Sequence, residues 1–302
     1  MGKLITWANA DYTDTIDGVE DTTSLIYAAD VYRYKKFRSA YSVKFTIKGM
    51  LPYLKEGQAV EVRKGQYFLV NRGSELECIP CAPGGEMLFV NFSAGLLNDV
   101  RRNDSDTLTA LLDDPGKDSG AIDFFEYVYP ASPAFTVFLQ EIATRMKSRG
   151  CSADDLSPDI FFEISKQLFA TQTGVKRQIE GIHAAAPATR EELYRRVLLA
   201  KSYMEDHWRA ALNHRDVAQI ACLSPYHFHR SFREAFGVSP MRWFRRLKLQ
   251  KAGEMLRRGR HTVHEVALHC GFGDIATFSK AFRREMGVSP SQAGSIGTVD
   301  LK

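Results

Sequence analysis

The chain has 302 residues, about twice the size of a typical domain, so we expect two domains with separate cores. With 44% hydrophobic and 25% charged residues, the composition excludes a disordered or collagen-like chain. It contains no apolar run of about 18 residues, and its first residues lack the apolar core of a secretory signal. Five cysteines form an odd, sparse set that favours reduced thiols. We therefore expect a cytoplasmic protein without membrane contact.

The charge is divided unevenly along the chain. Residues 1–186 carry 20 Lys and Arg against 25 Asp and Glu, whereas residues 187–302 carry 20 against 11. The net charges are therefore −5 and +9, which together give the overall +4. A basic C-terminal part favours a polyanionic partner such as nucleic acid, although excess charge alone is also compatible with an ordinary solvated surface.

Histidine follows the same division. Seven of the eight histidines lie beyond residue 200, the eighth is His183, and residues 1–182 contain none. Because histidine is the commonest residue for metal binding and for acid-base catalysis, its absence argues against both in the first domain. We predict no metal site and no cofactor.

The first half of the chain shows strand patterns followed by helix patterns. Short runs of alternating apolar residues, separated by Gly and Asn turns, predict a β-sandwich or small barrel over about residues 20–95. Residues 93–132 have the pattern of an irregular connection. Apolar residues at helical spacing predict helices at about 133–149 and 157–180, whose apolar stripes form either core or a dimer interface.

An internal repeat follows a predicted linker at 183–189. The 17 residues from Ser224 to Pro240 align with those from Asp274 to Pro290 at an offset of 50, and seven positions are identical. A Val-Ala pair precedes each copy, and Gly237 and Gly287 end the two segments. The duplicated unit therefore reads as a helix, a tight turn, a second helix and a glycine stop.

The second helix of the first copy has two distinct faces. Phe228 and Phe232 cluster on one side at 100° per residue, whereas Tyr226, Arg230 and Arg233 cluster on the other. An aromatic ring and two guanidinium groups at one-turn spacing suit base edges and phosphates in a DNA major groove. On one helix such residues could equally form a solvated face, but their recurrence in a basic domain favours DNA binding.

The region from Arg190 to Pro290 resembles the double helix-turn-helix domain of the AraC/XylS family of bacterial transcription regulators. The resemblance rests on the two copies with their Gly-Val-Ser-Pro ends, the Leu247-Lys248-Leu249 segment, Ala252, Leu256 and Gly271-Phe272. It implies a DNA-binding domain over 190–294, with helix-turn-helix units at about 213–237 and 262–287. A linking helix at about 241–256 would join them, so that they read successive major grooves of double-stranded DNA.

The resemblance also assigns base-facing positions. It places Tyr226, His227, His229 and Arg230 of the first unit, and Ile275, Ala276, Thr277, Ser279 and Lys280 of the second, against the bases, with Arg233 and Arg283 as further DNA contacts. The second set departs from the family because Ile275 and Ala276 replace hydrogen-bonding side chains. We therefore expect the first unit to read sequence and the second mainly to position the domain. Ser291–Gly294 replace the family's aromatic-Arg closure, which predicts a loose last turn.

The linking helix carries several cationic residues: Arg242, Arg245, Arg246, Lys248 and Lys251. Some of them are expected to meet phosphate or the acidic first domain, and most to be solvated. By a weaker resemblance, the first domain is similar to the cupin-like sensor barrel and helical dimerisation segment of the same family. The fold expected is therefore α+β, with a cupin-like β-barrel and dimerisation helices in 1–182 and an all-α double helix-turn-helix domain after them.

The expected barrel suggests an effector site. The inward-facing aromatic residues are Tyr27, Tyr41, Phe45, Tyr53 and Tyr67, and Arg38 is the one basic residue at the mouth. Together they could hold a small anionic or aromatic effector, or the aromatic residues could simply form the core.

The single C-x-x-C pair, Cys78 and Cys81, is compatible with redox sensing but favours structural cysteines, because no nearby histidine lowers a thiol pKa.

Three functions remain open. The leading one is a ligand-responsive transcription regulator that forms a homodimer and, by family resemblance, works with RNA polymerase. The alternative is the same DNA-binding regulator controlled by a protein that docks on the first domain, with no small-molecule ligand. The third, a DNA-modifying enzyme with a reactive cysteine, lacks a supporting cluster around any Cys, so we expect no enzyme. The residues themselves do not distinguish activation from repression.

Overall fold

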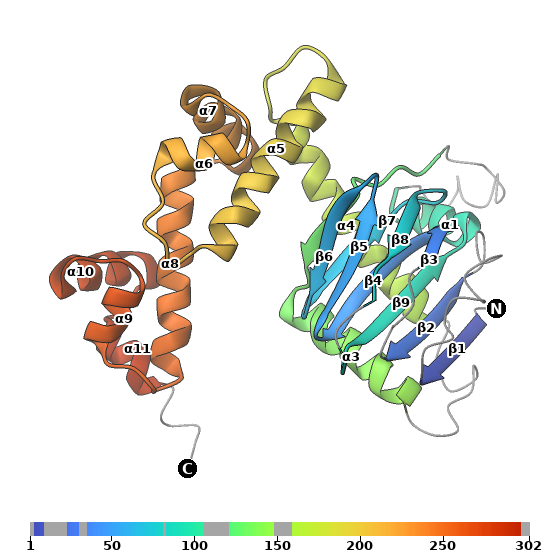
Figure 1. Cartoon of the computed structure of the whole chain (residues 1–302), viewed down its shortest axis with the longest axis horizontal. Helices are drawn as coiled ribbons and strands as arrows, with labels where there is room; N and C mark the ends of the chain where they lie inside the picture. The colour runs from blue at the N-terminus through green and yellow to red at the C-terminus, as the bar shows by residue number, and fades with distance from the viewer. Residues whose placement is uncertain are drawn as a thin grey trace. The chain divides into compact units, whose positions relative to one another are not determined.

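The computed structural model describes residues 3–8, 23–29, 35–80, 83–105, 121–147 and 159–296. The chain divides into two compact units, Met1–Thr173 and Gly174–Lys302. The first holds the strands and the second is helical (Figure 1), which confirms the predicted α+β class. The boundary falls within α4 (Asp159–Glu180), before the predicted linker at 183–189. That linker is also shorter than predicted, because Pro187 already begins α5 (Pro187–Asp206).

The N-terminal unit contains two β-sheets. One has six strands in the order β1-β2-β9-β4-β7-β10, and the other has four in the order β3-β8-β5-β6. β1 runs parallel to β2, and all other paired strands are antiparallel. The strand bounds are β1 Lys3–Ala8, β2 Ser24–Ala29, β3 Lys35–Arg38, β4 Tyr41–Lys48, β5 Met50–Lys55, β6 Gln58–Arg63, β7 Gln66–Val70, β8 Glu75–Cys78, β9 Glu86–Phe92 and β10 Tyr127–Pro130.

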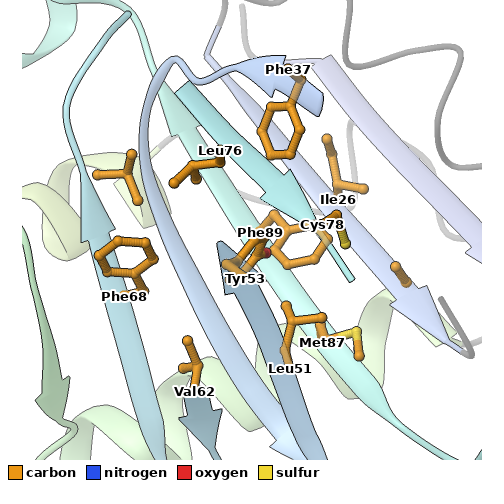
Figure 2. Close-up of a cluster of buried hydrophobic side chains, with 12 residues drawn as sticks. Ile26, Phe37, Leu51, Tyr53, Val62, Phe68, Leu76, Cys78, Met87 and Phe89 are labelled. Carbon is orange, nitrogen blue, oxygen red and sulfur yellow. The ribbon is translucent and has the colours of Figure 1, made fainter. Parts of the chain in front are cut away.

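The two sheets enclose a common apolar core. Figure 2 shows this cluster, in which Phe68, Met87 and Phe89 of the larger sheet meet Phe37 and Tyr53 of the smaller one. The described strands therefore form a two-layer sandwich and do not close into the barrel implied by the family resemblance. The sequence pattern alone had left sandwich and barrel open, because both bury alternate residues of each strand.

Three elements lie where none was predicted. β1 precedes the expected strand region, and the supposedly irregular 93–132 segment contains α1 (Ala94–Ser105) and β10. α1 is mostly polar and buries Leu97 and Val100 on one side, so its helical period is weak in the sequence. β10 is a four-residue strand that forms only by pairing with β7, and such a long-range contact has no local signal.

The two predicted helices of this unit are present and cover the outer face of the six-stranded sheet (Figure 1). They are α3 (Pro133–Lys147) and α4. The ring of Tyr67 on β7 lies 5.7 Å from that of Phe135 on α3, and its hydroxyl donates to Thr171 of α4 over 3.3 Å. Leu139 and Ile142 of α3 are buried, so this apolar stripe forms core within one chain.

The C-terminal unit consists of seven helices along the described residues after α4. α8 (Pro240–Arg257) is the long central helix, with α6 and α7 at one end and α9 to α11 at the other (Figure 1). The remaining bounds are α6 His214–Ile220, α7 Pro225–Phe236, α9 Val263–His269, α10 Ile275–Met286 and α11 Pro290–Ile296. Two apolar clusters, one around Phe228 and Phe232 and one around Phe278 and Phe282, form its core.

Candidate nucleic-acid interface

The first repeat forms a helix-turn-helix with defined ends. The Ser224 hydroxyl accepts a hydrogen bond from the His227 amide (3.3 Å), Pro225 occupies the first turn of α7, and Gly237 ends the helix at φ 72°. A side chain at that left-handed position would be strained, which explains the glycine. These local signals fix where α7 begins and ends, and therefore which side chains it exposes.

The second repeat has the same construction. The Asp274 carboxylate accepts a hydrogen bond from the Thr277 amide (2.7 Å), and this contact lowers the pKa of Asp274. Gly287 closes α10 at φ 77°. Each preceding turn also has a left-handed residue, Gly271 in the second unit and the non-glycine Cys222 in the first.

The buried face of α7 is the one that the helical wheel predicted, and α10 repeats the arrangement. Phe228 and Phe232 of α7, and Phe278 and Phe282 of α10, are fully buried. All eleven predicted DNA-facing residues remain at least partly accessible. Tyr226 is 71% exposed and Ile275 42%, although large apolar side chains are normally buried. His229 and Ser279 are half-buried, and the His229 ring packs against His214 at 5.7 Å.

Arg230 is held by an ion pair on its own helix. Its Nε lies 2.9 Å from Oε1 of Glu234, four residues later, while the side chain stays 46% exposed. The same carboxylate accepts a hydrogen bond from the His183 amide (3.1 Å) and lies 3.0 Å from His183 Nδ1. Glu234 therefore connects Arg230 of α7 to the segment that precedes α5.

The cationic residues of α8 have different environments. Arg242 and Arg245 are exposed, Arg246 pairs with Glu285, and Lys251 pairs with Glu254 at 3.5 Å. Lys248 is buried, and its ammonium group donates to the Ala210 carbonyl (2.9 Å). Burial lowers the pKa of Lys248. This lysine therefore links α8 to the turn after α5, contrary to the expectation that the charges along the helix meet phosphate or solvent.

The end of the unit is better packed than predicted. Residues 290–296 form α11, which packs on α8, and Ala293 is buried there. The Ser289 hydroxyl accepts from the Gln292 amide (3.3 Å), and the Gln292 side chain accepts from the Ser289 amide (2.9 Å). This reciprocal cap replaces the missing aromatic-Arg closure, so the last turn up to Ile296 is helical.

The predicted effector residues do not converge in the N-terminal unit. Tyr27, Tyr41 and Tyr67 lie on the helix-covered face of the larger sheet, where their hydroxyls donate to Glu86 (3.1 Å), the Ile122 carbonyl (2.8 Å) and Thr171. Tyr53 is on the other side, in the core between the sheets. Arg38 is 67% exposed and lies 3.6 Å from Glu75. The structure therefore does not bring these residues together as one site.

The sequence interpretation missed Lys44, which is buried between the sheets. Its neighbours Val43 and Phe45 point to the opposite face, since strand residues alternate. The alternation Ser42, Lys44, Thr46 is present in the sequence, but it resembles the solvent-facing side of a strand. Because this sheet is covered on both faces, the polar side of β4 is interior as well.

The described cysteines and acidic residues were compared with the requirements of a metal site and of a reactive thiol. Within those residues, no three His, Cys, Asp or Glu side chains are grouped so that they could hold a metal ion. Burial raises the pKa of the Cys270 thiol to about 11, which makes it unreactive at neutral pH. Cys78 is buried and Cys222 exposed, whereas Cys81 lies outside the described residues.

Among the described helices, none combines the length and the hydropathy that a membrane-spanning segment requires.

Comparison with known proteins places the second unit among helix-turn-helix domains. A family model described as a helix-turn-helix domain matches residues 217–294. The HTH-type transcriptional activator RhaS of Salmonella agona is 35% identical over 136 residues, which cover 38% of this chain and 49% of the relative. The match thus spans only about half the length of that relative.

Two solved structures are similar to this chain at lower sequence identity. A transcriptional regulator with an AraC-type DNA-binding domain from Chromobacterium violaceum is 23% identical, with 34% of this chain and 93% of that chain covered and a TM-score of 0.34. ToxT from Vibrio cholerae is 12% identical, with 91% and 98% covered and a TM-score of 0.33.

Proposed function

Because its C-terminal unit belongs to the AraC/XylS family of helix-turn-helix domains, we propose that this chain is a sequence-specific regulator of transcription, not an enzyme. The observation that supports this proposal is the repeated construction of α7 and α10. Each is a capped helix of 12 residues that buries a pair of phenylalanines and exposes its opposite face. A continuous α8 of 18 residues joins them, about 27 Å long at 1.5 Å per residue. Such a spacer suits two helices that enter successive grooves of one duplex.

The two helices have unequal roles in this proposal. Tyr226, His227, His229 and Arg230 supply ring and guanidinium groups that can distinguish base edges. Ile275, Ala276, Thr277 and Ser279 offer methyl groups and short hydroxyls, and Lys280 adds a charge suited to phosphate. Arg233 and Arg283 occupy matching exposed positions one turn from the helix ends. The first unit therefore supplies most of the sequence selectivity and the second mainly orients the domain.

Substitutions of Arg230 and Lys280 test this division. Arg230→Ala is expected to weaken binding to the preferred duplex by about 1–3 kcal/mol and to relax one base preference. Lys280→Ala should weaken binding to all duplexes alike, because a phosphate contact carries no sequence information. The measurement is fluorescence anisotropy with the preferred duplex and single-base variants of it. An equal loss of base discrimination in both variants would contradict the proposed roles.

Glu234 is expected to restrain Arg230 in the absence of DNA. Glu234→Gln removes a negative charge beside the proposed interface and should raise duplex affinity a few-fold, with the largest gain at low salt. An ion pair four residues apart on a helix contributes only about 0.3–0.5 kcal/mol. The amide oxygen of Gln can still accept the hydrogen bond from the His183 amide, so thermal stability should barely change. Glu205→Gln, which breaks the Lys201–Glu205 pair on α5 (2.6 Å), is the matched control. Equal affinity gains in both variants would assign the effect to net charge alone.

The N-terminal unit is proposed to bind a small-molecule effector and to mediate homodimerisation. The RhaS relative is named an activator, and we propose activation of transcription through RNA polymerase for this chain too. The same role places it in the cytoplasm. Duplex affinity measured with and without candidate effectors tests this part of the proposal.

A further inference from the structure

The turn that follows α4, Gly181–His183, lies against the last turn of α7. Ile182 is 1% exposed, and the His183 amide donates a hydrogen bond to Oε2 of Glu234 (3.1 Å). A Cβ atom added to Gly181 would lie 2.9 Å from the carbonyl oxygen of Glu234, which is closer than ordinary van der Waals contact. The absence of a side chain at Gly181 therefore lets the backbone of the turn approach α7.

Glu234 is an unusual residue for the last turn of a helix. The unpaired carbonyl groups give a helix C-terminus a partial negative charge, which disfavours a carboxylate there. The Glu234 side chain is also only 17% exposed. Burial raises the pKa of Glu234, but hydrogen bonds from Arg230 and from the His183 amide outweigh this effect and lower the pKa below its ordinary value. The carboxylate is therefore charged at neutral pH and is held from two segments of the chain.

The same carboxylate restrains the guanidinium group of Arg230. The Arg230 Nε lies 2.9 Å from Oε1 of Glu234, and Tyr226 interacts with the guanidinium from one turn earlier on α7. Because the guanidinium is planar, fixing its Nε–H also limits the directions in which the two Nη atoms can point. A side chain that is oriented before binding loses less freedom on binding and favours the base that matches its orientation.

This restraint is specific to Arg230. Among the described residues predicted to contact DNA, it is the one whose side chain forms an ion pair, and the neighbouring Arg233 has none. In the second repeat, Lys280 stands at the position of Arg230 and Arg284 at that of Glu234. Two positive charges four residues apart repel each other on a helix, so α10 cannot restrain its cation in the same way.

We propose that Glu234 and the Gly181–His183 turn position Arg230 for base reading, and so contribute to sequence selectivity without contacting a base themselves. Glu234 holds the guanidinium through Oε1, and the turn holds Glu234 through Oε2 and through the close approach at Gly181. Both are positioning elements, because they act through Arg230. The inference rests on the proposed DNA-binding function and adds to it the residues that set the orientation of its main base-reading arginine.

Gly181→Ala tests the turn without changing a charge or a side chain of α7. The backbone of Gly181 is outside the left-handed region, so the expected effect comes from the added Cβ alone. Gly174→Ala in α4 is the matched control, because no described atom beyond its own helix backbone lies within 4 Å of a Cβ there.

The measurement is fluorescence anisotropy of the full chain with the preferred duplex and its single-base variants. In Gly181→Ala we expect discrimination to fall about three- to tenfold at the base pair that Arg230→Ala also affects. In Gly174→Ala it should stay unchanged. Unchanged discrimination in Gly181→Ala, or an equal loss in the two alanine variants, would overturn the proposal.

Two substitutions of Glu234 keep the proposal testable if Gly181→Ala does not fold. Glu234→Ala removes both hydrogen bonds and should reduce discrimination at the same base pair. In Glu234→Gln the amide oxygen can still accept a hydrogen bond, so more of the discrimination should be retained. Both variants lose the same negative charge, so an effect of net charge on affinity is common to them. No loss in Glu234→Ala, or an equal loss in Glu234→Gln, would contradict positioning by this contact.

The Nε–H group of Arg230 reports on the restraint in the absence of DNA. Its exchange with solvent, measured by NMR on the full chain, should be faster in Gly181→Ala and Glu234→Ala than in the wild type, and unchanged in Gly174→Ala. Unchanged exchange in Gly181→Ala would refute the coupling of the turn to Arg230.

The inference and the proposed function fail separately. Absence of selective duplex binding by the wild type would refute the proposed function, and the exchange measurement would still decide whether the restraint exists. Selective binding by the wild type with unchanged discrimination in Gly181→Ala and Glu234→Ala would refute the inference alone.

Discussion

The affinity of the full chain for its preferred duplex is expected to fall by about 10³ to 10⁵ between 50 and 200 mM salt. This range applies if six to ten phosphates are contacted, because each neutralised phosphate releases a condensed counterion. The C-terminal unit exposes enough cationic side chains on or near α7, α8 and α10 for such a number: Arg230, Arg233, Arg242, Arg245, Lys280, Arg283 and Arg284. Anisotropy titrations at stepped KCl concentrations measure the slope.

Single charge removals give this prediction its control. Arg233→Gln and Arg283→Gln should each reduce the slope of log affinity against log salt by about 1, the value for one lost phosphate contact. Lys36→Gln in the N-terminal unit removes the same charge and should leave the slope unchanged. A shallow slope for the wild type would show that the basic surface of the second unit is not the DNA-binding surface.

Phe282→Ala is expected to destabilise the C-terminal unit by about 3–5 kcal/mol. Phe282 is fully buried, its ring lies 5.5 Å from that of Phe278, and it packs beside Gly253 of α8. Truncation leaves a cavity where α8 and α10 meet, so the second unit should lose its fold before the first. Urea unfolding followed by the fluorescence of Trp208 and Trp243, which are partly buried against the cores of this unit, measures the loss.

Ile275→Ala is the control for that substitution. It removes an apolar side chain from the same helix, but from a position that is 42% exposed, so stability should change by less than about 1 kcal/mol. Similar losses for Phe282→Ala and Ile275→Ala would mean that α10 does not bury the face described above.

The helix-turn-helix unit could be predicted from sequence because its signals are local. Ser224, Asp274 and the two closing glycines act within one helical turn, and the phenylalanine spacing identifies the buried face directly. Even here Lys248 was misjudged, because the carbonyl that it binds belongs to Ala210, 38 residues earlier. The periodicity of apolar residues within a helix cannot predict a contact between residues so far apart in the sequence.

The N-terminal unit was harder to predict because its strands depend on distant partners. In β4 both alternating sets, Val43 and Phe45 as well as Ser42 and Lys44, are buried, so alternation could not show which face is interior. The aromatic residues were therefore assigned to an effector site although three of them pack beneath helices. Arg38 was expected at the mouth of a barrel, but it is exposed and pairs with Glu75, whereas the buried cation is Lys44.

Selection of bound duplexes from a random pool by the full chain tests the central claim most directly. The account predicts an enriched motif with two blocks about one helical turn apart, one better defined than the other. Selection with Arg230→Ala should reduce the base preference within the better-defined block and leave the weaker block unchanged. A bound pool with no enriched motif would contradict sequence-specific DNA recognition by this chain.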